Sequence, residues 1–171
     1  VYIGGDLVYV SGDFGIHIYR IEDNRDLLPV KVLATDEIGG VVKEVIVNGS
    51  QMYVLLPENG IVDVYELLSG RFDLVNSIVL RDDVSGDFMA ENMLLSGDHL
   101  MVSTGQRGTV RLYALRPDGE TTNVAELRLA YLLQSGDISA EDLSLVGQTL
   151  YVVGGQGDLQ LFDISSWLDG R

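Results

Sequence analysis

Hydrophobic and polar residues alternate along most of the chain in short runs, and these runs are separated by Gly, Asn, Asp and Ser. Alternation with a period of two predicts β-strands that bury one face, and the separating residues are typical of tight turns. Four stretches share one form, in which an apolar strand is followed by a turn glycine and a second apolar strand: VYIGGDLVYV, EVIVNGSQMYV, NMLLSGDHLMV and DLSLVGQTLYV. No stretch favours a helix, so the sequence predicts an all-β fold.

These stretches belong to a repeat of about 44–50 residues. A third strand follows each of them, and its aromatic residue recurs at the same interval: Tyr19, Tyr65, Tyr113 and Phe162. A fourth apolar stretch follows in the first three repeats. Four antiparallel strands per repeat of this length predict β-propeller blades, which we expect over residues 1–40, 41–87, 88–137 and 138–171. A β-sandwich is the alternative fold, but a sandwich does not require this period.

The last repeat ends after its third strand, so its blade lacks the outer strand. The chain also begins abruptly, with a strand at Val1. Either the four blades close into a small ring with one incomplete blade, or they form an arc of a larger propeller; we expect the arc. Because an arc leaves apolar faces at both ends, we expect a protein partner. This partner is either the rest of a longer parent chain or a second copy that completes the ring.

The last repeat, GQTLYVVGGQGDLQLFDIS, resembles LVIVD-type propeller repeats, in which an apolar alternation ends in Asp and Ile or Val. The earlier repeats depart from this pattern at the position of Asp163, where they have Arg20, Glu66 and Ala114. The resemblance implies a propeller, and propellers of this kind are mostly binding or surface proteins.

The net charge of −15 comes from 26 acidic and 11 basic residues. Such a surface repels nucleic acid and anionic membranes, so we expect neither as a partner. No apolar run approaches the roughly 18 residues of a membrane helix, and we expect no membrane insertion. The absence of cysteine excludes disulfides and thiolate zinc sites. An acidic, lysine-poor surface fits an extracellular or cell-surface protein.

The tripeptide Ser-Gly-Asp occurs four times, and two of its copies open the aligned loops SGDFMAEN and SGDISAED. In a propeller these loops lead into the innermost strand of the next blade, at the mouth of the central channel. They would gather carboxylates that suit a hard cation such as Ca²⁺: Asp87, Glu91, Asp137, Glu141 and Asp142. Glu44 and Lys43 would lie in the same ring, and the lysine favours a solvated acidic rim instead. Recognition of a cationic partner is the third interpretation.

The sequence contains few of the residue patterns that are typical of catalytic, metal or phosphate-binding sites. The two histidines, His17 and His99, fall on different kinds of segment, which disfavours a histidine metal site or a catalytic triad. The glycine-rich GGQGD at 154–158 lacks the lysine and the following helix of a phosphate-binding loop, and a hairpin loop explains it. We therefore expect no enzyme and no cofactor, but a non-catalytic interaction or scaffold module. The alternatives are a cation- or ligand-binding propeller with an acidic mouth, and a propeller enzyme of the lactonase or lyase type.

Overall fold

The computed structural model describes the whole chain except residues 69, 81–88, 105–107, 116–120, 129–138 and 169–171. Its described residues form fifteen strands in four separate antiparallel sheets, together with two short helices. The prediction of an all-β fold with one sheet per repeat is therefore confirmed. The chain divides into two compact units, Val1–Val79 and Leu80–Arg171, and each unit contains two sheets.

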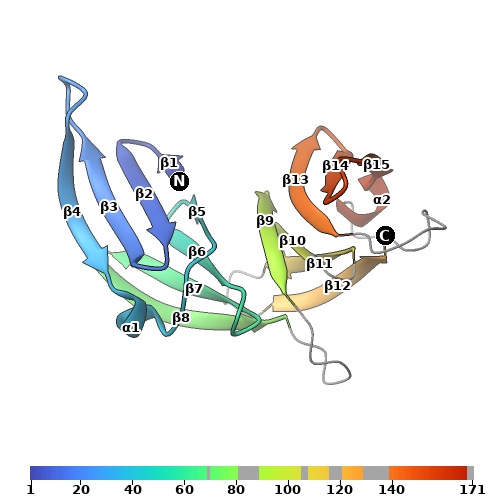
Figure 1. Cartoon of the computed structure of the whole chain (residues 1–171), viewed down its shortest axis with the longest axis horizontal. Coiled ribbons are helices and arrows are strands. Elements are labelled where there is room, and N and C mark those ends of the chain that lie inside the picture. The colour runs from blue at the N-terminus through green and yellow to red at the C-terminus, as the bar shows by residue number, and fades with distance from the viewer. Residues whose placement is uncertain (69, 81–88, 105–107, 116–120, 129–138, 169–171) are drawn as a thin grey trace. The chain divides into compact units, whose positions relative to one another are not determined.

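The first unit contains blades 1 and 2, each a meander of four consecutive strands (Figure 1). Blade 1 consists of β1 (Tyr2–Gly4), β2 (Leu7–Gly12), β3 (Gly15–Ile21) and β4 (Leu27–Leu33). Blade 2 consists of β5 (Glu44–Asn48), β6 (Gln51–Leu56), β7 (Ile61–Leu68) and β8 (Arg71–Val79). The first strands of the two blades, β1 and β5, lie side by side, as the innermost strands of neighbouring propeller blades do.

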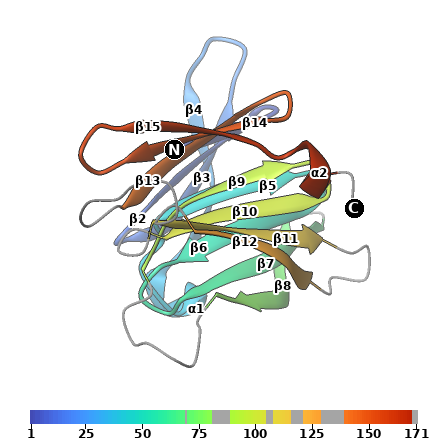
Figure 2. The same cartoon turned by 90° about the vertical axis from the view of Figure 1, so that its right-hand side faces the viewer.

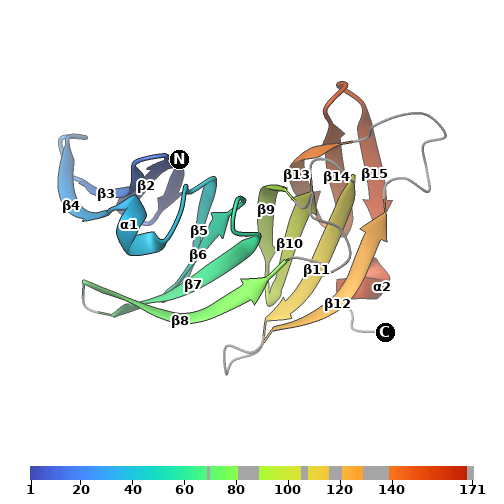
Figure 3. The ribbon, with the colours of Figure 1, turned by 60° about the horizontal axis from the view of Figure 1, so that its bottom comes forward.

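The second unit contains blades 3 and 4, which repeat this arrangement (Figure 3). Blade 3 consists of β9 (Ala90–Ser96), β10 (His99–Thr104), β11 (Thr109–Leu115) and β12 (Thr121–Arg128). Blade 4 consists of β13 (Ala140–Val146), β14 (Thr149–Gly154) and β15 (Leu159–Asp163). The first strands β9 and β13 again lie side by side. Within the described residues blade 4 has no fourth strand, as its sequence predicts.

Two helices of one turn each were not expected from the sequence. Helix α1 (Thr35–Ile38) follows blade 1, and the Glu37 side chain accepts a hydrogen bond from the Ala34 N–H at 2.9 Å. Helix α2 (Ser165–Leu168) follows β15 (Figure 2), and its Trp167 and Leu168 pack against the core of the second unit. A helix of four residues is too short to produce a hydrophobic period of 3.6, so the residue pattern does not reveal it.

The core of each unit is the layer between its two sheets, and the same positions build it in both units. In the first unit the second and third strands of blade 1 supply Tyr9, Ile16 and Ile18, and blade 2 supplies Met52, Val54 and Tyr65. In the second unit blade 3 supplies Met101, Val110 and Leu112, and blade 4 supplies Leu150, Val152 and Phe162. The repeat seen in the sequence is therefore the repeat of one packing interface.

No helix among the described residues is long and apolar enough to cross a membrane.

Candidate functional site

The loop between the second and third strands of a blade lies at the same end as the connection that enters its first strand. In the first unit the Asn59 side-chain amide donates to the Gly39 carbonyl at 2.9 Å. In the second unit the Gly155 N–H donates to the Ser139 hydroxyl oxygen at 2.9 Å. We call this end of each unit its mouth end, because in a propeller it surrounds the opening of the channel.

The mouth end of blade 4 contains two hydrogen-bonded pairs of polar side chains, which together we call the blade 4 cluster: Ser139 with Glu141, and Asp158 with Gln160. The Ser139 hydroxyl donates to Glu141 Oε1 at 3.2 Å, and the Gln160 amide donates to Asp158 Oδ2 at 3.2 Å. Glu141 is exposed, whereas the other three are half-buried. The cluster therefore offers a solvent-accessible carboxylate with a hydroxyl group beside it.

Two adjacent glycines let this cluster assemble. A Cβ on Gly155 would lie 2.1 Å from Ser139 Oγ and 2.4 Å from Glu141 Oε1, and a Cβ on Gly154 would lie 2.1 Å from Asp158 Oδ1. Any side chain at either position would displace the polar groups. The GGQGD sequence is a hairpin loop, as expected, but its first two glycines also make room for the cluster.

A β-bulge determines the position of Glu141. Ala140 pairs with Gly154 and Asp142 pairs with Val153, so Glu141 has no partner residue on β14. An extra residue of this kind re-aims its side chain, and such bulges are frequent beside functional sites. The bulge places Glu141 against Ser139 and leaves Asp142 on the following ladder position.

The structure brings together only part of the predicted acidic ring. Glu141 joins the blade 4 cluster, but Asp142 is exposed, and its carboxylate accepts a hydrogen bond from the neighbouring Leu143 N–H at 2.9 Å. Glu91 is half-buried near the start of β9, and Asp87 and Asp137 lie outside the described residues. Among the residues that the structure describes, no three His, Asp or Glu side chains are grouped so as to hold a metal. The calcium site stays a prediction.

Lys43 and Glu44, which the sequence assigns to the same ring, lie in the first unit at the entrance to blade 2. Glu44 begins β5 and is half-buried, whereas Lys43 precedes the strand and is exposed. The Lys43 N–H donates to the Leu55 carbonyl at 3.0 Å, which ties this entrance to the second strand of the blade.

Sequence reasoning missed a recurring polar position on the third strand of each blade, two residues before the aromatic. Its occupants are His17, Asp63, Arg111 and Gln160. Their shared spacing from the aromatic is the signal that could have revealed them. Arg111 is buried, and its guanidinium donates to the Leu80 carbonyl.

Asp63 is the buried carboxylate at this position. Its side chain is 4% exposed and accepts a hydrogen bond from the Ser77 hydroxyl at 2.5 Å. Burial raises the pKa of Asp63, and the Ser77 hydrogen bond partly opposes this. Burial, together with the charge of Asp63, raises the pKa of the nearby Tyr65 to about 12. Tyr65 therefore stays protonated in the core of the first unit, where it packs between blades 1 and 2.

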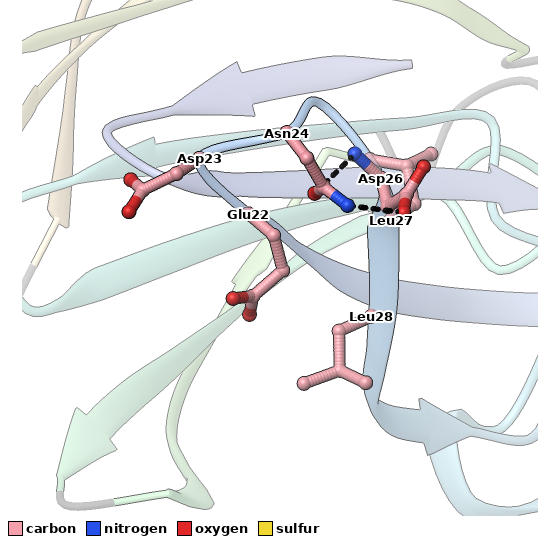
Figure 4. A pocket seen from close by; sticks show the side chains of 6 residues that line it. All are labelled: Glu22, Asp23, Asn24, Asp26, Leu27 and Leu28. Atoms are coloured by element: carbon pink, nitrogen blue, oxygen red, sulfur yellow. Dashed lines mark hydrogen bonds between the residues drawn. The ribbon is translucent and has the colours of Figure 1, made fainter.

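A pocket of about 500 Å³ lies at the opposite end of blade 1, against the hairpin between β3 and β4 (Figure 4). Its lining consists of Glu22, Asp23, Asn24, Asp26, Leu27 and Leu28. The Asn24 side chain donates to Asp26 Oδ2 at 2.5 Å and accepts from the Asp26 N–H at 3.2 Å. These bonds are local to one hairpin, so the pocket is a surface concavity that brings no distant parts of the chain together.

No sequence-family model matches the chain, and no curated protein matches it. Solved structures do. The periplasmic gluconolactonase of Pseudomonas aeruginosa matches with a TM-score of 0.72 and 19% identity, over 95% of this chain and 48% of that one. A candidate 6-phosphogluconolactonase from Bacteroides fragilis matches with a TM-score of 0.68 and 18% identity, over 93% and 48%. The N-terminal domain of Nup159 matches with a TM-score of 0.57 and 16% identity, over 91% and 38%.

The chain has the β-propeller fold. It spans about half the length of the two lactonase structures, which fits the expected arc of a larger propeller. The expectation that the chain is no enzyme is wrong, because the structures that it resembles include propellers named as lactonases. The error came from equating catalysis with histidine and cysteine, which are scarce or absent in this sequence. The resemblance to LVIVD-type repeats stays a prediction.

Proposed function

We propose that this chain is part of a propeller enzyme that hydrolyses a sugar lactone. The observation that carries the proposal is the likeness to two lactonases over 93–95% of the chain. The alternative that the sequence left open, a propeller enzyme of the lactonase type, is thereby preferred to a non-catalytic scaffold.

The charge of the chain favours an uncharged lactone over a phosphorylated one. With 26 acidic residues against 11 basic residues, the protein repels an anionic substrate at long range. Binding a sugar phosphate normally requires a cluster of basic side chains or free backbone N–H groups at a helix terminus. A neutral lactone such as gluconolactone, the substrate class named for the Pseudomonas aeruginosa relative, is the better match.

The blade 4 cluster supplies a general base for this reaction. In hydrolysis a water molecule attacks the lactone carbonyl, the ring C–O bond breaks, and the ring oxygen takes up a proton to become a hydroxyl. We assign the exposed Glu141 carboxylate as the general base that removes a proton from the attacking water. The Ser139 hydroxyl, 3.2 Å from Glu141 Oε1, orients that carboxylate.

The test measures gluconolactone opening by the acid that it releases, at constant pH, with the spontaneous rate subtracted. Glu141→Gln should reduce kcat by about 100-fold or more, because general-base catalysis contributes about 10²–10⁴-fold. Glu22→Gln is the matched control, because it changes an exposed carboxylate at the end of blade 1 that lies away from its mouth end. It should leave the rate unchanged.

A rate equal to the spontaneous one for the unsubstituted protein would reject the proposed activity. Full activity in Glu141→Gln would retain the activity but reject the role of Glu141. Faster opening of 6-phosphogluconolactone than of gluconolactone would reject the argument from charge.

A secreted location belongs to the same proposal. It rests on the acidic surface, which has only two lysines, and on the periplasmic location named for one structural relative.

A further inference from the structure

Blade 3 repeats the β-bulge that positions Glu141 in blade 4. The ladder between β9 and β10 skips Glu91, because its two neighbours pair with consecutive residues: Ala90 with Thr104 and Asn92 with Ser103. Glu91 is the second residue of β9, as Glu141 is the second residue of β13. These two strands lie side by side in the second unit (Figure 1). Neighbouring blades therefore each carry a bulged glutamate at the mouth end.

The fold does not require a carboxylate at this position. In blade 2 the equivalent residue is Lys43, whose N–H donates to the Leu55 carbonyl at 3.0 Å. Leu55 also pairs with the following residue, Glu44, so two residues again lie opposite one. A lysine thus occupies the position as a glutamate does. The glutamates of blades 3 and 4 are therefore free to serve a function that these two blades share.

The two glutamates have different surroundings. The residue two positions before Glu141 is Ser139, whose hydroxyl donates to its carboxylate at 3.2 Å. The residue two positions before Glu91 is Met89, which is 43% exposed and offers an apolar surface instead of a hydroxyl. Glu91 is half-buried, whereas Glu141 is exposed. Blade 3 therefore does not repeat the arrangement that we assign to proton transfer in blade 4, and Glu91 suits a binding role.

A sugar lactone carries the groups that this part of blade 3 can bind. Its ring hydroxyls donate hydrogen bonds, and the two oxygens of a carboxylate can accept from two of them. Such bonds are stronger than those between neutral groups, because the acceptor is charged. The C–H groups of the ring pack favourably on an apolar side chain such as that of Met89.

We propose that Glu91 is a substrate-binding residue, which accepts hydrogen bonds from ring hydroxyls of the lactone that Glu141 helps to hydrolyse. The two bulged glutamates then divide the work, since Glu91 holds the sugar and Glu141 activates the water. This inference rests on the proposed function for the identity of the ligand, a neutral sugar ring.

Steady-state kinetics of gluconolactone opening separate the two glutamates. Glu91→Gln keeps the shape of the side chain but removes its charge, so KM should rise about 10-fold while kcat stays unchanged. Glu141→Gln should instead lower kcat, and Glu22→Gln should change neither constant. A fall in kcat without a change in KM for Glu91→Gln would overturn the binding role, and so would kinetics equal to those of the unsubstituted protein.

A binding experiment tests Glu91 without hydrolysis. D-Glucose has similar ring hydroxyls but no ester bond, and an NMR titration measures its Kd. The unsubstituted protein and Glu141→Gln should bind glucose equally, whereas Glu91→Gln should bind it about 10-fold more weakly. In the unsubstituted protein, glucose should also shift the backbone amide signals of Glu91 and Asn92, a result that needs no variant.

The two experiments together distinguish a failure of this inference from a failure of the proposed function. Binding of glucose through Glu91 by a protein that does not open gluconolactone would reject the activity and keep the binding role. No binding of glucose by the unsubstituted protein would overturn the inference, and so would an equal Kd for Glu91→Gln or unshifted signals at Glu91 and Asn92.

Discussion

The interface between blades 1 and 2 and the interface between blades 3 and 4 use the same six apolar positions but differ in the polar residue next to the aromatic. In blade 2 this residue is Asp63, which is buried beside Tyr65 and bonded to Ser77. In blade 4 it is Gln160, which lies two residues before Phe162 and donates a hydrogen bond to Asp158 of the blade 4 cluster. The apolar positions hold the blades together, so the polar position is free to differ between them.

The loops at the mouth end differ in a second way. In blade 1 the loop between β2 and β3 contacts the connection that leaves the blade, where the Thr35 side-chain hydroxyl donates to the Asp13 carbonyl at 2.8 Å. In blade 4 the corresponding loop is held by the Ser139 side chain. A hydroxyl side chain holds the loop in both blades, but in blade 4 the same hydroxyl also donates to Glu141 Oε1 at 3.2 Å. The contact in blade 4 therefore positions a carboxylate, and this difference favours blade 4 as the site of chemistry.

The largest expected effects test whether the two interfaces are energetically equivalent. Ile18→Ala in the first unit and Leu112→Ala in the second should each lower the free energy of unfolding by about 2–5 kcal/mol, because each leaves a cavity in a closed core. Leu74→Ala, at an exposed position, should change it by less than about 0.5 kcal/mol. Urea denaturation measures all three variants. A loss below about 1 kcal/mol in one of the two core variants would show that the interfaces are not equivalent.

The next effect tests how the two mouth loops are held. Gly15 has a φ of 97°, and its Cβ would lie 2.1 Å from the Leu33 carbonyl oxygen. Gly157 has a φ of 81°, but its Cβ would meet no atom within 4 Å. Gly157→Ala should therefore cost only the left-handed backbone strain of about 1–2 kcal/mol, whereas Gly15→Ala should cost clearly more. Urea denaturation again gives both values, and equal losses would contradict the difference between the loops.

The smallest effect concerns pH. Because burial raises the pKa of Asp63 above its usual 3.8, the folded protein retains a proton that the unfolded chain has already released. The free energy of unfolding therefore falls as the pH rises from 3.8 through the folded-state pKa. Asp63→Asn removes this decrease, so its stability relative to the unsubstituted protein should increase as the pH rises through that window. Denaturation at a series of pH values measures the difference.

Asp163 in blade 4 provides a control, because its pKa is shifted in the opposite direction to that of Asp63. The Ser165 backbone N–H, 2.9 Å from its carboxylate, lowers the pKa of Asp163, and the Ser165 side chain adds to this. Its contribution to stability is present above 3.8 and is lost as the pH falls through the folded-state pKa. Asp163→Asn should therefore be less stable at neutral pH, with a difference that disappears in acid. A pH-independent difference for both variants would contradict these assignments.

The repeat of alternating strands was readable from the sequence because it is a local property. Each strand needs an apolar residue at every second position, and each hairpin needs a residue that accepts a left-handed backbone, as Gly49 does with a φ of 60°. The recurring aromatic residue of the third strand was readable for the same reason, because a position that packs between blades recurs in every blade. These features predicted the propeller blades and the incomplete fourth blade.

Only the tertiary structure decided which polar groups meet. Ser139 and Gly155 are sixteen residues apart in number, and they meet because β13 and β14 pair around a bulge at Glu141. The sequence placed Glu141 and Asp142 in one acidic ring, but the bulge sends only Glu141 to the cluster. The sequence also could not reveal that Asp63 and Arg111 are buried. Burial depends on the neighbouring sheet and not on the strand that carries the residue.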